Sequence, residues 1–312
     1  MNSTSYTYQP LLPGANCIRL LRLLPGEPAE KLQCELFNYQ IRNNQTSCLY
    51  EALSYVWGDP TEKNDICIDS KQFAITSNLA AAFYRLRDPS LPRLLWVDAI
   101  CINQADLEER ENQVQFMSVI YSCASRVVVW LGEGCPQSNQ ACRLIIEAAD
   151  ASQRAEETTR PGEENAIIAL LRRPWFYRVW VLQEVAMARF TLLLCGDFQM
   201  TAHEFSSGLR QFRHEYDQEK TIVSTIESVV YLLEWQPRGG NLGSKLLPLS
   251  ELIDIFHHRQ ATDIRDKVYA LYGMSTDMMD TRSLQVNYQK PWSTLFKDLA
   301  QYSFGEKVHV TI

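Results

Sequence analysis

The sequence lacks the short motifs by which the common enzyme and nucleotide-binding folds are recognised. It contains no GxGxxG or GxxxxGKS/T loop, no GxSxG elbow and no HExxH helix. These absences exclude the usual dinucleotide, P-loop, serine-hydrolase and zinc-protease sites. Whatever the chain does, it does without one of these familiar constellations.

Positive charge and long apolar runs are also scarce. Lys and Arg number 30 against 37 Asp and Glu, which gives a net charge of −7. We therefore expect no general attraction to nucleic acid or to an anionic membrane, and Arg172-Arg173 is the sole hint of a local basic patch. No apolar run approaches the roughly 18–20 residues that span a bilayer. The sequence predicts neither a nucleic-acid partner nor a membrane span.

The nine cysteines are odd in number and scattered from Cys17 to Cys195, with no CxxC pair. A secreted domain usually has an even, clustered set that forms disulfides. The first ten residues, MNSTSYTYQP, have neither the basic start nor the apolar centre of a signal peptide. Together these features predict reduced thiols, and hence a location in the cytosol or the nucleus, of which we expect the cytoplasmic one.

The composition is that of a globular protein, with 46% hydrophobic and 21% charged residues among 312. Strand-like stretches at 50–57, 94–97 and 127–131 alternate with helical patterns that begin near Asn78 and Asp106. This alternation predicts an α/β fold with a mainly parallel sheet flanked by helices. A β-hairpin insertion is expected around Asp69-Ser-Lys-Gln72, and Asn78 is expected to cap its helix.

Three segments are expected along the chain. Residues 1–48 read as an N-terminal tail followed by early strands, residues 49–200 as the α/β domain, and residues 201–312 as a mostly helical extension. Within the extension we expect helices at 204–217, 222–235, 249–258 and 264–273. Lys307 to Ile312 reads as a strand that stops within its pattern, so we expect a chain truncated at its C-terminus.

Polar residues follow the expected parallel strands where each strand ends. Trp57-Gly58-Asp59 follows the first, and Asp98 opens the segment Asp98-Ala-Ile-Cys-Ile-Asn103-Gln104 after the second. In an open parallel sheet, ligands bind beyond the carboxyl ends of the strands. Trp57, Gly58, Asp59, Asp98, Asn103 and Gln104 are therefore candidate ligand-binding residues. The alternative for Asp98 is that it caps a turn or a helix.

Pro174 is expected to start a helix over Trp175–Ala188, on which Tyr177, Trp180 and Glu184 would share one face. A carboxylate buried beside aromatic rings has a raised pKa and suits acid–base work or contact with a sugar hydroxyl. Glu184 is the candidate catalytic residue. Its neighbours Arg178, Trp180 and Gln183 are candidate ligand-binding residues. The alternative is that Glu184 forms an ion pair with Arg178 or Arg126 and only braces the fold.

Two further features carry less weight. His257-His258 has no third ligand at a suitable spacing, so we expect an exposed pair on a helix and no metal site. Cys101 follows the Asp98 strand, but no motif ties a histidine to it, so a Cys/His nucleophile has little support.

Five segments of the chain resemble the motifs of the fungal heterokaryon-incompatibility (HET) domain, in the family's order. They are Tyr50-Glu-Ala-Leu-Ser-Tyr-Val-Trp-Gly-Asp59, Leu95-Trp-Val-Asp-Ala-Ile-Cys-Ile-Asn-Gln104, the stretch 121–132 with Val127-Val-Val-Trp-Leu-Gly132, Arg173-Pro-Trp-Phe-Tyr-Arg-Val-Trp-Val-Leu-Gln-Glu184, and Ala261-Thr-Asp-Ile-Arg-Asp-Lys-Val-Tyr-Ala-Leu-Tyr-Gly273. The resemblance covers roughly residues 50–275. One departure is Ile264, where the family usually has proline.

This resemblance implies a role in fungal allorecognition and programmed cell death, as an effector that works through self-association or with an incompatibility partner protein. The HET domain has in turn been compared with the TIR domain, a flavodoxin-like fold whose NAD-cleaving members use a glutamate in a W-C-x-x-E element. Trp180-Val-Leu-Gln-Glu184 resembles that element, with Val181 in place of the cysteine. A TIR-like fold is thereby implied.

Two functions stay open at this stage. The first is a signalling or death-effector module without catalysis. The second is a TIR-like NAD glycohydrolase in which Glu184 contacts the ribose, Trp57 or Trp180 stacks on a ring, and Asp98 or Asn103 binds a hydroxyl or amide. In that case NAD would be the substrate, and no other cofactor is expected. An enzyme needs Glu184 and Asp98 to line one open cleft, whereas an interaction module can bury both in ion pairs.

Overall fold

The computed structural model describes residues 6–11, 16–42, 48–153, 164–216, 219–234, 247–276, 284 and 286–304. Within these residues the chain forms an α/β fold with one nine-stranded sheet and eleven α-helices. The α/β class predicted from the sequence is thus confirmed. No helix in the described part of the chain is long and apolar enough to cross a membrane.

The sheet has the strand order β5-β4-β2-β1-β6-β3-β7-β8-β9. The strands are β1 Cys17–Leu23, β2 Gln33–Gln40, β3 Glu51–Tyr55, β4 Lys63–Ile68, β5 Lys71–Thr76, β6 Arg93–Trp96, β7 Arg126–Trp130, β8 Thr191–Cys195 and β9 Phe198–Thr201. The central strands β6, β3, β7 and β8 are parallel neighbours. β1 pairs antiparallel with both β2 and β6, and β9 pairs antiparallel with β8.

The expectation of a mainly parallel sheet is wrong, because the sheet is mixed. The sequence spacing correctly marks the crossover-connected strands of the centre. The spacing does not indicate where the early strands pair, and β1 joins the same sheet antiparallel to β6. Short connections also produce antiparallel pairs, such as β8 and β9, which are joined by a tight turn.

The two innermost strands show why the centre forms. All five residues of β3 are buried, and four of the five residues of β7 are buried. A strand covered by helices on both faces needs apolar residues at successive positions, and Val127-Val-Val-Trp130 provides them. The amino ends of these parallel strands lie on one side of the sheet and their carboxyl ends on the other, so the residues that follow them emerge together.

The β-hairpin expected around residues 69–72 is confirmed as β4 and β5. Asp69 and Ser70 both have positive φ, 49° and 65°. A two-residue hairpin turn of this hand matches the right-handed twist of the flanking strands, and Asp tolerates the left-handed region better than most residues. The hairpin joins the sheet through the parallel pairing of β4 with β2.

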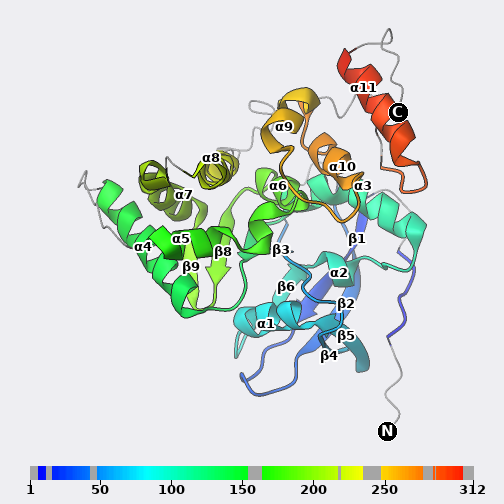
Figure 1. Cartoon of the computed structure of the whole chain (residues 1–312). Coiled ribbons are helices and arrows are strands. Elements are labelled where there is room, and N and C mark those ends of the chain that lie inside the picture. The colour runs from blue at the N-terminus through cyan, green and yellow to red at the C-terminus, as the bar shows by residue number, and fades with distance from the viewer. Residues whose placement is uncertain are drawn as a thin grey trace.

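The helices are α1 Ser77–Leu86, α2 Asp98–Cys101, α3 Leu107–Cys123, α4 Pro136–Gln153, α5 Glu164–Leu171, α6 Trp180–Ala186, α7 Ala202–Gln211, α8 Lys220–Glu234, α9 Leu249–Phe256, α10 Asp266–Tyr272 and α11 Trp292–Phe304. In Figure 1, α4, α5, α7 and α8 gather around β8 and β9 at the left of the view, while α1 lies at the lower centre and α2 to the right of it. The later helix α10 packs against α6, and α9 packs against α10.

The helix expected over Trp175–Ala188 is interrupted, so that prediction is wrong. A short 3-10 helix, η1 Pro174–Tyr177, is followed by extended backbone at Arg178 and then by α6. At the break Val179 donates its N–H to the Gln260 carbonyl, 2.9 Å away, and Gln260 donates to Tyr177, 2.6 Å away. A segment from far along the chain thus takes the backbone bonds that a continuous helix would use, and Tyr177 no longer shares a face with Glu184.

The role expected for Asn78 is also wrong. Thr76 is the N-cap of α1, and Asn78 lies inside the first turn with its side chain directed at two other elements. The four helices expected after residue 201 occur as α7, α8, α9 and α10, whereas α11 was not expected. One other expectation, the strand from Lys307 to Ile312, lies outside the described residues.

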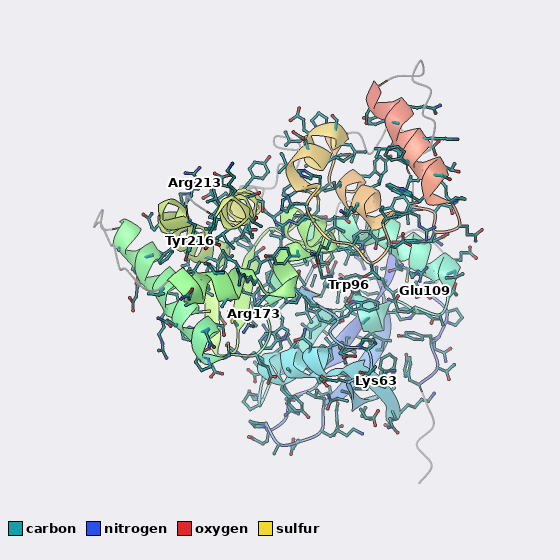
Figure 2. All side chains as sticks on the ribbon, in the orientation of Figure 1. Lys63, Trp96, Glu109, Arg173, Arg213 and Tyr216 are labelled. Carbon is teal, nitrogen blue, oxygen red and sulfur yellow. The ribbon has the colours of Figure 1, made fainter. Side chains whose placement is uncertain are left out.

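One hydrophobic core lies between the sheet and the helices that pack on it. Its largest fully buried side chains include Trp96, Trp175, Tyr55 and Tyr121. Figure 2 places Trp96 in the middle of the molecule, between Arg173 on one side and Glu109 on the other. Trp96 and Tyr121 meet edge to face, with ring centroids 5.4 Å apart, an arrangement that aromatic rings favour.

The contact between α7 and α4 depends on Gly208. A Cβ added at Gly208 would lie 2.0 Å from the Ile145 carbonyl oxygen, which is rigid backbone. We predict that Gly208→Ala lowers the free energy of unfolding by about 1–3 kcal/mol, because this overlap outweighs the roughly 1 kcal/mol by which alanine favours a helix.

Urea unfolding of Gly208→Ala and of the neighbouring Ser207→Ala measures this effect. Ser207 is only partly buried, so its replacement should change the unfolding free energy by less than about 0.5 kcal/mol. Equal stability of the two variants would contradict the close packing of α7 on α4.

Candidate functional site

The carboxyl ends of β3 and β6 bring Trp57 and Asp98 together. The two strands are parallel neighbours, so the residues that follow them emerge at the same edge of the sheet, called here the carboxyl rim. The Trp57 indole Nε1 donates to Asp98 Oδ2 at 2.8 Å, and the Ala99 N–H donates to Asp98 Oδ1 at 2.8 Å. Trp57 is 41% exposed, which is high for a tryptophan, and Asp98 is half-buried. The indole therefore marks the surface end of the cluster.

Arg178 provides the positive charge at this rim. It donates through Nη1 to the carbonyl of Tyr55, the last residue of β3. Burial raises the pKa of Asp98, and the Arg178 guanidinium and the Trp57 indole partly offset that rise. Arg178 can reach the strand end because the chain is extended at this position, between η1 and α6. The break in the expected helix therefore positions this side chain.

Glu184 lies beneath this layer, on α6. It is 2% exposed, and burial raises its pKa to about 7. Arg178 and the Ser54 hydroxyl lower that pKa, while the nearby Asp98 carboxylate raises it. The Ser54 hydroxyl in turn accepts a hydrogen bond from Trp175 Nε1 at 2.9 Å. Glu184 and Asp98 thus lie near enough for the charge of one carboxylate to affect the pKa of the other.

One oxygen of Glu184 is unusual. Glu184 Oε2 is buried and has no hydrogen-bond partner. A buried charged oxygen without a partner is costly, so the protonated form is favoured up to nearly neutral pH. This carboxyl can hold or release a proton close to pH 7, which is the property that acid–base chemistry requires.

Trp180 and Gln183 turn away from the carboxyl rim. Burial raises the pKa of Asp266 on α10, and side-chain hydrogen bonds from Tyr288 and Trp180 partly offset that rise. Tyr288 donates to the Asp266 carboxylate at 2.7 Å. Gln183 is buried against Gly273, where an added Cβ would lie 2.2 Å from Gln183 Nε2. In the structure both side chains pack α6 onto α10, away from Asp98.

Gly58 and Asp59 form a turn beside the cluster. Gly58 has φ +83°, a conformation that favours glycine. Asp59 is exposed and accepts from the Thr61 N–H at 2.8 Å and from the Thr61 hydroxyl at 2.6 Å. Its carboxylate therefore closes its own turn, and the hydrogen bonds from Thr61 lower its pKa.

Asn103 and Gln104 hold the loop that carries Asp98. Gln104 Nε2 donates to the Asp98 carbonyl at 2.9 Å, and the Asn103 N–H donates to Glu109 Oε1 at 2.6 Å. Asn103 Oδ1 accepts from the Ala105 N–H at 3.3 Å. These bonds stabilise the loop itself.

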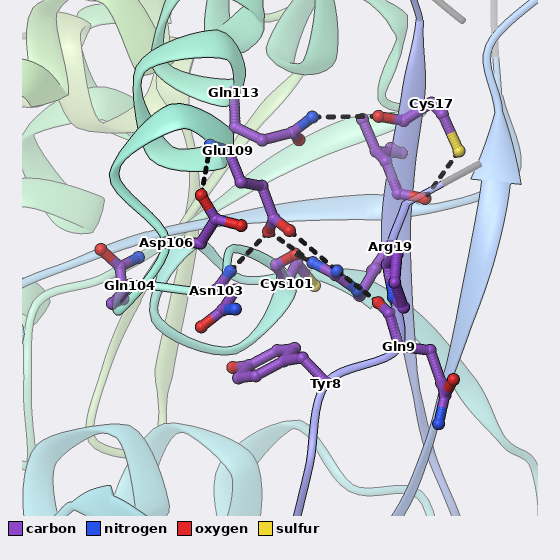
Figure 3. A network of polar contacts seen from close by, with 12 residues as sticks. Tyr8, Gln9, Cys17, Arg19, Cys101, Asn103, Gln104, Asp106, Glu109 and Gln113 are labelled. Atoms are coloured by element: carbon purple, nitrogen blue, oxygen red, sulfur yellow. Dashed lines mark hydrogen bonds and ion pairs between the residues drawn. The ribbon is translucent and has the colours of Figure 1, made fainter. Parts of the chain in front are cut away.

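Figure 3 shows the centre of this loop network, the buried ion pair between Arg19 and Glu109. Arg19 reaches both oxygens of Glu109, at 2.6 and 2.9 Å, and also donates to the carbonyls of Cys101 and Gln9 at 3.1 and 2.7 Å. Its side chain is 3% exposed. The early strand β1 therefore anchors the loop that positions Asp98, a connection that sequence patterns gave no means to find.

Two further polar side chains at the carboxyl rim were missed. Asn78 Nδ2 donates to the Val56 carbonyl at 2.6 Å, and Asn78 Oδ1 accepts from Trp130 Nε1 at 3.0 Å. Arg173 donates to the carbonyls of Leu131 and Glu133 at 2.6 and 2.7 Å. Both satisfy backbone groups where β3 and β7 end. Asn78 was mistaken for a cap, and Arg173 for part of a basic patch.

The remaining candidates show no sign of activation. Burial raises the pKa of the Cys101 thiol to about 12, so it is not a thiolate near neutral pH. None of the nine cysteines, all of which are among the described residues, forms a disulfide bond. Within the described ranges no group of three or more His, Cys, Asp or Glu side chains is arranged to hold a metal ion.

A hollow of about 900 Å³ lies at the opposite edge of the sheet, called here the amino rim, where the parallel strands begin. It is lined by Leu49, Glu51, Pro92, Arg93, Leu94, Ser125, Arg126, Phe190, Thr191, Leu192, Thr201, Ala202 and His203. The sequence predicts ligand binding at the carboxyl ends of the strands and gives no indication of a hollow at the amino rim.

A model of the heterokaryon incompatibility protein (HET) family matches residues 50–184. The chain is also 28% identical, over 350 aligned residues, to heterokaryon incompatibility protein 6, OR allele, of Neurospora crassa. That alignment covers 88% of this chain and 50% of the relative. The chain contains a HET domain. It spans about half the length of the curated relative it matches, and no solved structure matches it.

The matched HET domain begins at Tyr50 and ends at Glu184. It therefore includes Trp57, Asp98 and Arg178 as well as Glu184. Two residues that support the cluster lie outside it: Arg19 precedes it, and Gln260, which bonds to the break before α6, follows it. The carboxyl-rim cluster of the HET domain is thus held by contacts from both flanks.

Glu184 generates a prediction on stability. Its pKa in the folded chain, about 7, lies above its ordinary value of 4.5. The folded state therefore binds more protons than the unfolded state between these values, so ionising Glu184 reduces stability as pH rises and costs nothing below pH 4.5. We predict that Glu184→Gln is about 3 kcal/mol more stable than the wild type at pH 8 and equal to it at pH 4.

Urea unfolding of both proteins at pH 4, 6 and 8 measures this difference, with Glu62→Gln as a control because Glu62 is exposed. A stability difference for Glu184→Gln that does not change with pH would show that folding does not raise the pKa of Glu184.

Proposed function

We propose that this HET-domain protein is an effector of cell death in fungal allorecognition and that it acts through self-association. The relative from Neurospora crassa is named for heterokaryon incompatibility. The burial of Glu184 carries the mechanistic part of the proposal. An effector that works by association can enclose its charged residues, whereas an enzyme needs an open cleft beside them.

The contacts of Glu184 support this assignment. It is 2% exposed, lies under Asp98 and Trp57, and is flanked by Arg178 and Ser54. Its neighbours on α6 pack onto α10, and β1 anchors the Asp98 loop. Such a braced cluster presents a fixed surface, as recognition between protein surfaces requires.

A growth experiment tests the proposal. Inducible expression of the chain in a filamentous fungus should arrest growth, because raising the concentration drives self-association without the natural trigger. Glu184→Gln should arrest growth equally, since it preserves the volume and fold of the site. The measurement is colony extension at matched protein level, with Glu62→Gln as a second comparison. Unaltered growth with the wild-type chain would refute the effector assignment.

A second candidate function is a TIR-like NAD glycohydrolase that uses Glu184. The observation in its favour is the unpartnered Glu184 Oε2 together with the raised pKa of this carboxyl. A substrate would approach past the exposed Trp57 ring and the half-buried Asp98. Water would add to the ribose carbon as the bond to nicotinamide breaks and its electrons leave with nicotinamide, and the ionised Glu184 carboxylate would accept the proton that the water loses. The negative charge of Glu184 and Asp98 would also stabilise the positive charge that develops on the ribose.

For this second function we predict that wild-type protein releases nicotinamide from NAD and that Glu184→Gln lowers the rate at least about 100-fold, the usual scale of an acid–base contribution. Chromatography of the products at several protein concentrations provides the measurement. Asp98→Asn should also lower the rate, whereas Glu62→Gln should not. Equal rates in wild type and Glu184→Gln would exclude Glu184 as the catalytic carboxyl.

A further inference from the structure

The three most exposed large hydrophobic residues of the described chain gather at the amino rim. Leu49 is 91% exposed, Phe190 70% and Leu91 65%. Leu49 precedes β3, Phe190 precedes β8, and Leu91 precedes Pro92 at the start of β6. Leu49, Phe190 and Pro92 line the hollow of about 900 Å³. Clustered exposed apolar residues of this kind usually mark a contact surface.

The floor of the hollow carries surplus positive charge. Glu51, at the start of β3, pairs with both Arg93 and Arg126 on the neighbouring strands. These two guanidinium groups outweigh the effect of burial and hold the pKa of Glu51 below its ordinary value. Two positive groups thus face one negative group, and the Arg126 side chain is 43% exposed. The hollow suits an apolar side chain with carboxylates beside it.

The chain presents such a group on its own surface. After the three residues at the amino rim, Leu107 is the most exposed large hydrophobic side chain of the described residues, at 55%. Asp106 and Glu108 on either side of it are also exposed. We call residues 106–108 the acidic knob. Its apolar centre and negative flanks complement the apolar lining and the positive charge of the hollow.

The acidic knob and the hollow lie at opposite ends of α3. Leu107 opens the helix after the loop of Asp98 at the carboxyl rim. Cys123 closes it at the amino rim, where its carbonyl accepts from the Cys48 N–H at 2.7 Å, next to Leu49. The 17 residues of α3 span about 25 Å. A molecule therefore cannot place its own acidic knob in its own hollow.

We propose that the acidic knob of one copy inserts into the amino-rim hollow of the next, with Leu107 against Leu49 and Phe190, and Asp106 and Glu108 toward Arg126. The two surfaces differ, so the contact is head to tail and each bound pair of copies leaves one knob and one hollow free. Such a contact builds chains of molecules unless a rotation closes it into a ring. The inference rests on the proposed function, because it specifies the surface through which self-association occurs.

Analytical ultracentrifugation of the whole chain tests the contact. We expect the wild type to form species that grow with concentration. Phe190→Glu removes the hollow and Leu107→Glu removes the knob, so each variant should remain monomeric by itself. An equimolar mixture should form a dimer and nothing larger, because the knob of Phe190→Glu fits the hollow of Leu107→Glu and the other two surfaces are disabled.

The exposed Ile264 provides the matched control, since Ile264→Glu changes an equally accessible apolar residue elsewhere and should associate like the wild type. Association retained in both single variants, or a mixture that stays monomeric, would overturn this contact while leaving self-association in place. A wild type that is monomeric throughout would overturn both the contact and self-association, whereas the growth experiment tests the cell-death role independently.

Discussion

The parallel pairing of β3 with β6 on one side and β7 on the other is the constraint on which the rest of the structure depends. Because β3 is buried along its whole length, the polar groups at both of its ends need hydrogen-bond or ionic partners within the protein. At its start, Glu51 is held between two arginines. At its end, Ser54 and Tyr55 contact the cluster of Glu184, Asp98 and Arg178. One short strand therefore organises two chemically different rims.

The carboxyl rim is held from three separate parts of the chain. Arg19 on β1 anchors the Asp98 loop, and Asn78 on α1 donates a hydrogen bond to the Val56 carbonyl just after β3. Gln260 forms the backbone hydrogen bonds at the break before α6. The break allows Arg178 to reach the strand end, and α6 then carries Glu184 beneath it. A buried carboxyl with one unpartnered oxygen is costly, and these contacts keep it in place. The same rigidity suits either a recognition surface or a site that holds a proton near neutral pH.

Much of this arrangement follows from residue patterns. The run Val127-Val-Val-Trp130 predicts a strand covered on both faces, Asp69-Ser70 predicts the hairpin turn, and the parallel strands predict that Trp57 and Asp98 emerge together. The patterns failed where a polar residue has two uses. Asn78 has the chemistry of a helix cap, yet its amide is used to satisfy β3 and Trp130. The choice between these uses depends on partners far away in the sequence.

The sequence by itself determined the α/β class, the central strands and the HET motifs, because these depend on local periodicity and on residue types at short spacing. Only the tertiary structure decided that the sheet is mixed, that the helix before Glu184 breaks at Arg178, and that Trp180 and Gln183 face α10. It also decided that a hollow opens at the amino rim. Each of these outcomes depends on contacts between segments tens to hundreds of residues apart, whose pairing energies no local pattern records.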